Sequence, residues 1–184
     1  MVTRSITGPN GGHFNFNRTN GQASAQGMGS RGATFSAQWG GGTATAHATG
    51  RHGGQASFHR SGGVANLDAS GPRGAALNAQ RTISPDGSAS AHGTLTTRGG
   101  DTFAFSRHND GQGNRSTNIT GSNGAHFNSS WSRTEDGLEG QRSWTRANGG
   151  TGSAEISRGD GEVSASRTRT TAGGRTFNTS FNSF

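Results

Sequence analysis

The residues that could carry metal or catalytic chemistry are seven histidines and ten acidic residues. Zinc sites take histidine, cysteine and carboxylate ligands at short, characteristic spacings, but the chain has no cysteine and no H-E-x-x-H or comparable motif. His13 and His126 occupy the same position of a repeated segment, which is typical of a surface strand position and not of a unique ligand. We therefore expect no metal and no cofactor.

Several acidic residues also recur at regular intervals along the chain. Asp86, Asp110, Asp136 and Asp160 each directly precede a glycine, and the four are almost evenly spaced along the chain. Asp-Gly pairs favour tight turns, whereas a catalytic pair of carboxylates would be unique in the chain. A phosphate-binding loop of the form G-x-x-x-x-G-K-[ST] is impossible because the chain has no lysine. The sequence predicts that the protein is not an enzyme and has no catalytic residues.

The basic residues are all arginine, 17 in number, and the net charge is +7. Arginine next to an aromatic ring can bind polyanions or single strands by charge and stacking. Arg133 near Trp131, and Arg142 and Arg146 beside Trp144, are the candidates. The alternative is that these rings pack between sheets and that scattered arginines keep the repeat in solution.

The small number of large apolar residues limits the kind of fold that could position a functional site. Leucine, isoleucine, valine and phenylalanine number 4, 4, 3 and 10, or 21 of 184 residues. That share is well below the roughly 20% under which chains usually fail to fold around a core. Order must come from stacked backbone hydrogen bonds and repeated side chains. No apolar run is long enough for a membrane helix, and no signal peptide is visible at the start.

Internal repetition is the strongest signal in the sequence. Ile6 to Asn15 reads ITGPNGGHFN and Ile119 to Asn128 reads ITGSNGAHFN, with eight of ten positions identical. A Gly-x-x-Phe motif recurs at intervals that fit a unit of roughly 21–26 residues. Period-two alternation, as in Ala33, Phe35, Ala37 and Trp39, indicates strands with one apolar and one polar face. We count about eight units of two strands each, in one glycine-rich β-domain spanning residues 1–184.

Turn signals separate the strands roughly every 10–13 residues, because Asn-Gly and Asp-Gly accept the positive φ angles of tight turns. The predicted turn residues are Asn10, Gly11, Asp86, Gly87, Asp110, Gly111, Asn123, Gly124, Asp136, Gly137, Asp160 and Gly161.

Two all-β architectures satisfy this pattern: a β-solenoid with one coil per unit, which we favour, or a long antiparallel β-meander with one hairpin per unit. Repeating the phenylalanine at one place predicts a buried ladder. Its members would be Phe14, Phe35, Phe58, Phe103, Phe127 and Phe177.

These features resemble bacterial secreted fibre proteins of the functional-amyloid, curli-like type, which are built from repeats of about this length with two strands per coil and glycine-rich turns. The resemblance is one of architecture and implies a role in adhesion or matrix building, outside the cell or at its surface. We expect a structural subunit whose partner is itself, polymerising through strand edges or stacked faces into a filament or biofilm matrix. Polyanionic matrix components could bind through arginine.

The alternative is a monomeric solenoid that binds ice or a polyanion. Thr43-Ala44-Thr45 and Thr168-Arg169-Thr170 are similar to the Thr-x-Thr rows of ice-binding solenoids. A soluble monomer would favour this second reading.

Overall fold

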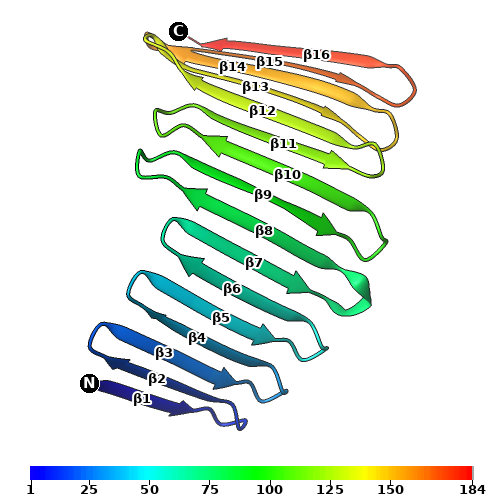
Figure 1. The fold of residues 1–184 in the computed structure, drawn as a ribbon. Coiled ribbons are helices and arrows are strands. Elements are labelled where there is room, and N and C mark those ends of the chain that lie inside the picture. Colours follow the sequence, from blue (N-terminus) through cyan, green and yellow to red (C-terminus); the bar gives the residue numbers. More distant parts are fainter. Residues whose placement is uncertain (184) are drawn as a thin grey trace. The chain divides into compact units, whose positions relative to one another are not determined.

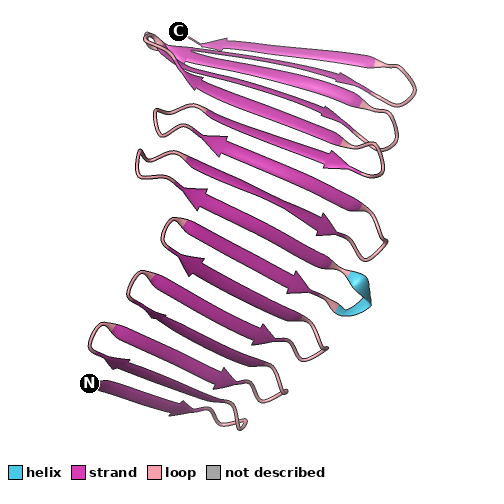
Figure 2. Ribbon diagram, in the orientation of Figure 1, coloured by secondary structure: helices cyan, strands magenta, loops and turns pink. Residues whose placement is uncertain are grey.

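A computed structural model describes residues 1–183 and is all-β (Figures 1 and 2). The sixteen strands follow one another in sheet order as they do in the sequence, and sequence neighbours pair antiparallel. This is a β-meander, the alternative architecture above, and not the favoured solenoid. Turns of two to five residues join adjacent antiparallel strands, whereas a solenoid would stack parallel ones. Within residues 1–183, the single helical element is a short 3-10 turn, Pro72–Gly74.

The chain divides into two compact units, which we describe separately. The first unit comprises Met1–Thr82 and Thr94–Gly100, and the second comprises Ile83–Gly93 and the described residues from Asp101 onward. The prediction that the whole chain folds as one repetitive domain stays a prediction.

Strands of seven or eight residues fill most of the first unit, after a six-residue edge strand. They are β1 (Val2–Thr7), β2 (His13–Thr19), β3 (Gln22–Met28), β4 (Thr34–Gly40), β5 (Thr43–Thr49), β6 (Gln55–Ser61), β7 (Val64–Ser70) and β8 (Ala76–Ile83), whose last residue belongs to the second unit.

Most strands of the second unit lengthen to eight or nine residues. After β9 (Ala89–Thr96), whose residues are shared between the units, they are β10 (Thr102–Asn109), β11 (Arg115–Gly121), β12 (His126–Arg133), β13 (Gly137–Thr145), β14 (Thr151–Gly159), β15 (Glu162–Thr170) and β16 (Thr176–Ser183).

Two kinds of turn set the registers of the first unit. The tight two-residue turn Asn20-Gly21 has positive φ at both positions, 49° and 77°, and so does Gly41-Gly42, at 58° and 79°, which matches the twist of the flanking strands. The opposite strand ends carry five-residue loops with glycine at the fourth position. In the loop from Gly8 to Gly12, the Gly8 N–H donates to the Gly12 carbonyl at 2.8 Å and the Gly11 N–H donates to the Gly8 carbonyl at 3.1 Å.

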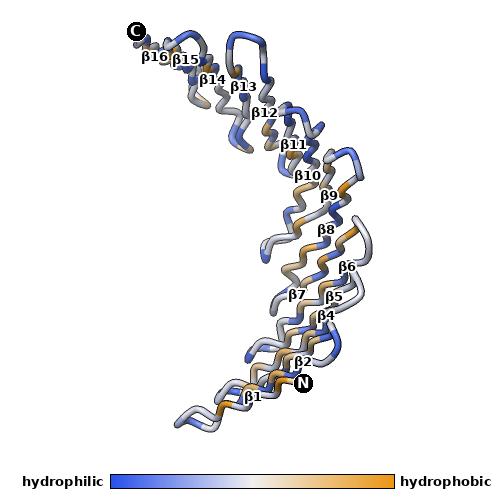
Figure 3. Tube along the Cα trace, turned by 90° about the vertical axis from the view of Figure 1, so that its left-hand side faces the viewer, coloured by the Kyte–Doolittle hydropathy of each residue, from blue (hydrophilic) through white to orange (hydrophobic). Residues whose placement is uncertain are grey.

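Neither unit has a conventional core. Hydropathy changes from residue to residue along the strands, and the turns range from neutral to hydrophilic (Figure 3). Among the described residues, the only buried apolar side chains are Ala23 and Ala25. The side chains of each unit therefore project from the two faces of a single sheet, where they are accessible to partners.

Candidate functional site

The first unit has one apolar face, which follows from the strand register. Paired residues of antiparallel strands point to the same side, so the register links side chains into rows that run across β1 to β8. Row 1 is Ile6, Phe14, Gly27, Phe35, Ala48, Ala56, Ala69 and Leu77. Row 2 is Arg4, Phe16, Ala25, Ala37, Ala46, Phe58, Leu67 and Ala79. Row 3 is Val2, Arg18, Ala23, Trp39, Ala44, Arg60, Ala65 and Arg81.

Aromatic rings close over small residues on this apolar face. Phe14 and Phe35 stack at 6.3 Å between centroids and 2° between planes, across Gly27, which lies between them in the register. A Cβ at Gly27 would lie 3.5 Å from the Phe14 ring and 3.6 Å from the Phe35 ring. Phe16 and Trp39 lie 6.0 Å apart, on the strands either side of Ala23 and Ala25, which explains why those two alanines are buried.

Nothing in the first unit covers the apolar face. Phe14, Phe35 and Trp39 remain 37%, 38% and 42% exposed. Contiguous exposed apolar surface of this kind is rare on monomers in solution and usually marks an interaction site. The opposite face is polar, and its side chains bond across strands, as when Gln80 Nε2 donates to Asn66 Oδ1 at 2.9 Å and Asn78 donates to Asp68.

The second unit carries a different face, which we call the arginine face. Row 1 of this face is Phe105, Ile119, Phe127, Trp144, Gly152, Arg169 and Phe177. Row 2 is Arg107, Thr117, Ser129, Arg142, Ala154, Arg167 and Thr179. Row 3 is Asn109, Arg115, Trp131, Gly140, Ile156, Ala165 and Phe181. Row 4 is Arg133, Leu138, Arg158, Val163 and Ser183.

Charge is sorted between the two sides of the second unit. The seven arginines in strands β10 to β15 all lie on the arginine face and are exposed. The strand carboxylates Glu139, Glu155 and Glu162 pair with residues of the opposite, polar face. The remaining acids of the unit lie in turns. The arginine face is therefore cationic, with no strand carboxylate on it.

Glycine again supports the aromatic rings. A Cβ at Gly140 would lie 2.6 Å from the Trp131 ring, and one at Gly152 would overlap Trp144. Arg115 lies over Trp131 and Arg167 lies over Trp144, each with its guanidinium carbon 5.7 Å from the ring centroid. Stacked guanidinium groups keep their outer N–H donors free for an anion.

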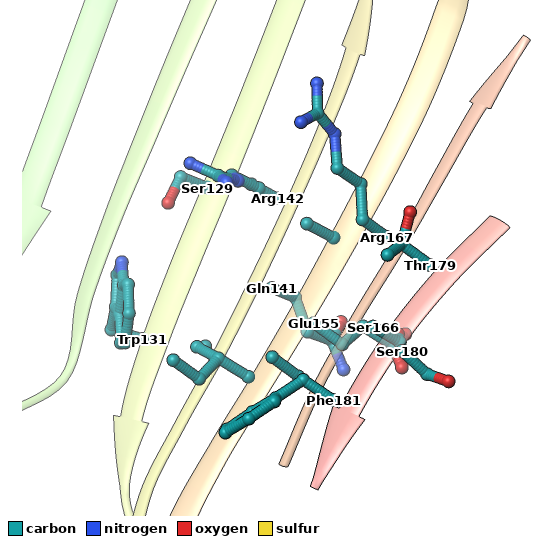
Figure 4. Close-up of a pocket in the computed structure, with 14 residues that line it drawn as sticks. Ser129, Trp131, Gln141, Arg142, Glu155, Ser166, Arg167, Thr179, Ser180 and Phe181 are labelled. Carbon is teal, nitrogen blue, oxygen red and sulfur yellow. The ribbon is translucent and has the colours of Figure 1, made fainter. Parts of the chain in front are cut away.

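A groove of about 420 Å³ crosses β12 to β16 on this unit (Figure 4). Trp131 and Phe181 lie at its two ends, and Arg142 and Arg167 extend along one side. Ala154, Ile156 and Ala165 also line it. The groove therefore combines flat apolar walls with two cationic side chains, and Glu155, which belongs to the opposite face by register, also contributes to its lining.

The predicted phenylalanine ladder is only partly assembled. Phe14 and Phe35 share a row and stack, but Phe58 lies one row away. Phe127 and Phe177 share row 1 of the arginine face, whereas Phe103 pairs with Gly121 in a different row. The rings are not buried in a single chain, contrary to the prediction, because each unit is one sheet layer; Phe177 is 51% exposed.

The predicted turn residues lie between strands, except that Gly137 is the first residue of β13. Gly11, Gly87, Gly111, Gly124 and Gly161 have φ between 77° and 85°. Two turn aspartates accept local hydrogen bonds. The Ser88 hydroxyl and then its N–H lower the pKa of Asp86, and the Gln112 N–H lowers the pKa of Asp110.

Sequence reasoning found part of the arginine face. Of the residues named as candidates for polyanion binding, Trp131, Arg133, Arg142 and Trp144 lie on this face, whereas Arg146 lies in a turn. It missed five further arginines, which are Arg107, Arg115, Arg158, Arg167 and Arg169. The signal that could have found them is a spacing of two residues, which places side chains on the same face of a strand. Arg107 follows Phe105 by two residues, and Arg158 follows Ile156 by two.

Comparisons with known proteins give no relative. No family model matches the chain, and neither the curated proteins nor the solved structures include a match. Among residues 1–183, no helix has the length and apolarity that crossing a membrane requires, and no group of three or more metal-binding side chains comes together. The row composition makes the apolar face of the first unit and the arginine face of the second the candidate sites.

Proposed function

We propose that the protein is a structural subunit that associates with copies of itself into a filament or matrix. The observation that carries this proposal is the uncovered apolar face of the first unit. Rings that are 37–42% exposed on one continuous face gain stability when a second sheet covers them. Fully burying one such side chain contributes about 1.5–3 kcal/mol.

The distribution of arginine on this face favours a second copy as its cover. Three of its four strand arginines, Arg18, Arg60 and Arg81, lie in row 3, at one border of the face. A two-fold axis parallel to the rows would pack row 2 on itself and set row 3 against row 1 of the partner. Arg18, Arg60 and Arg81 would then lie at the rims of the interface, where water can reach them, and Arg4 would lie at the β1 end of the otherwise apolar central row.

Open strand edges supply a second mode of association. Among the described residues 1–183, β1 and β16 each pair with one neighbouring strand, which leaves backbone groups on their other side without a partner in this part of the chain. β16 contains no charged residue and no proline, the devices that usually block pairing of edges. Pairing of β16 with β1 of the next copy would extend the sheet head to tail. We place this assembly outside the cell or at its surface, which cell fractionation would test.

A matched pair of variants tests association through the apolar face. Ala46 lies in row 2, and its neighbour Thr45 points to the polar face of the same strand. Ala46→Asp should raise the concentration needed for association more than about ten-fold, because an unpaired carboxylate would be buried in the interface. Thr45→Asp should leave that concentration nearly unchanged. Analytical ultracentrifugation gives the concentration, and electron microscopy shows whether filaments form.

Two outcomes would overturn the proposal. The wild-type chain could stay monomeric at high concentration, or both variants could weaken association equally while circular dichroism shows intact sheet. The mixed composition of the polar rows gives ice binding no support: the polar row that contains Thr45 also holds Asn17, Ser24, Gln38 and His59.

A further inference from the structure

We infer that the arginine face of the second unit binds single-stranded nucleic acid, with phosphates at the arginines and bases against the aromatic walls of the groove. This site is separate from the apolar face of the first unit and does not depend on self-association. Three features of the second unit lead to it: sorted charge, alternation of cationic and aromatic rows, and a groove of suitable size.

The sorted charge gives the face its preference for polyanions. The face has a positive potential because seven exposed arginines lie on it, while Glu139, Glu155 and Glu162 belong to the opposite face. If the two kinds of residue were mixed on both faces, their charges would largely offset each other. All the cationic groups are guanidinium groups, which bind phosphate in a bidentate manner and also stack on bases.

The rows place cationic and aromatic groups alternately. Row 2, with Arg107, Arg142 and Arg167 among small residues, runs between rows 1 and 3, which carry most of the rings. Arg142 and Arg167 are two strands apart, about 10 Å at ordinary strand spacing, with Ala154 between them. A flexible phosphate backbone can follow row 2 while its bases turn to either side.

The groove supplies the flat surface that a base requires. Its volume of about 420 Å³ lies between Trp131 and Phe181, and Phe181 is 58% exposed. Stacking on such rings tolerates any base, so the site would bind single strands without strong sequence preference. An anionic glycan could use the same arginines, and it is therefore the comparison ligand in the test.

The test measures binding of the full chain to a labelled oligothymidylate of about 20 nucleotides and to heparin, by fluorescence anisotropy. The Ala46→Asp background removes association through the apolar face, and the protein is kept below the concentration at which sedimentation detects pairing of strand edges. Arg142→Gln with Arg167→Gln should weaken oligothymidylate binding about ten-fold in low salt and reduce the slope of log affinity against log salt by about 1.4, since each phosphate contact contributes about 0.7. The charge-matched control, Arg31→Gln with Arg51→Gln in turns of the first unit, should change neither much.

Aromatic variants separate nucleic acid from glycan. Phe181→Leu should weaken oligothymidylate binding about five-fold and leave heparin binding unchanged, because only a base loses a stacking partner. Phe14→Leu in the first unit is the matched control. Circular dichroism confirms that each variant is folded.

Three results would overturn the inference: no oligothymidylate binding at about 50 mM salt, an equal loss from the control arginine pair, or a Phe181→Leu variant that binds as the wild type does. The third result, combined with tight heparin binding, would assign the face to anionic glycans instead. These three results come from binding measurements. The proposed self-association is tested separately, by sedimentation of the wild-type chain, so failure of one proposal can be told from failure of the other.

Discussion

The two units use one architecture for two different surfaces. Both are single antiparallel layers whose rings lie over glycine or alanine, and both repeat the same loop. The Gly8–Gly12 loop and the loop from Gly121 to Ala125 have the same pair of backbone hydrogen bonds, at 2.8 and 3.1 Å in one and 2.7 and 3.1 Å in the other. The difference lies between the loops, where alanine fills the face of the first unit and arginine fills much of the face of the second.

The loops set the register in both units, while the side chains on the faces differ between them. Loop glycines recur at even spacing in the first unit, at positions 11, 32, 53 and 74, with φ from 78° to 82°. In the second unit they recur at a wider, equally even spacing, at positions 124, 149 and 174, with φ from 80° to 82°. The wider spacing gives longer strands, and the arginine face of the second unit therefore has a fourth row. The loop conformation stays the same, so the face holds more side chains without a new kind of turn.

The largest expected contrast comes from one substitution made in both units. Ala25 is 6% exposed and pairs with Phe16 and Ala37, so Ala25→Asp would bury an unpaired carboxylate. We expect it to destabilise the first unit by roughly 2–3 kcal/mol. Ala154 instead pairs with Arg142 and Arg167, so Ala154→Asp should be neutral or stabilising. Hydrogen exchange followed unit by unit measures both effects, and equal losses in the two units would contradict the difference between the faces.

A second, smaller contrast concerns the glycines beneath rings. A Cβ at Gly140 would lie 2.6 Å from Trp131, whereas one at Gly27 would make ordinary contact with Phe14 and Phe35 and approach the His13 carbonyl oxygen at 3.0 Å. Gly140→Ala should therefore displace the Trp131 ring and cost about 1–2 kcal/mol, more than Gly27→Ala. Tryptophan fluorescence reports the displacement, and urea unfolding gives the free energy. An unchanged spectrum in Gly140→Ala would show that the ring does not rest on Gly140.

The shared loop predicts equal effects in the two units. Gly53 and Gly149 have φ of 80° and 81°, and open space surrounds the position of a Cβ at each. Substitution by alanine should cost about 1 kcal/mol at either position, because only the backbone conformation is penalised. Urea unfolding of Gly53→Ala and Gly149→Ala measures this cost. A large difference between them would mean that the two loops are not equivalent.

Much of the architecture could be predicted from the sequence. Period-two alternation identified the strands, and Asn-Gly and Asp-Gly pairs such as Asp160-Gly161 identified turns. The ten repeated residues beginning at Ile6 and at Ile119 form equivalent hairpins, with Ile6 paired to Phe14 and Ile119 to Phe127. The preference for a solenoid was wrong because those short turns bring sequence neighbours together antiparallel, leaving no coil to stack.

Row membership could not be predicted, because it depends on register across strands and not on spacing along the chain. The residue that takes the place of Phe35 after the next loop glycine is Ala56, and Phe58 lies two positions further on, in the next row. We assumed one approximate repeat length for the whole chain. The repeat is in fact shorter in the first unit than in the second, and the single assumed length concealed this shift. The stacked pairs of the arginine face were missed for the same reason, because Arg115 and Trp131 become neighbours only through pairing of β11 with β12.

The smallest expected effect is a pH dependence confined to the second unit. Asp86 and Asp110 both lie in its turns, and hydrogen bonds from Ser88 and Gln112 lower the pKa of each below the ordinary value of 3.8. A lowered pKa in the folded state contributes stability that is present above pH 3.8 and is lost as the pH falls through the folded value. Both groups are exposed, so the loss should be small. Protection of the turn amides around these residues, taken as the intrinsic exchange rate relative to the observed rate at each pH, should therefore fall below pH 3.8 in the wild type, and Asp110→Asn should flatten the response around Gln112. The first unit has no turn aspartate, so an equal response in its loops would mean that acid acts through the whole sheet and not through these two carboxylates.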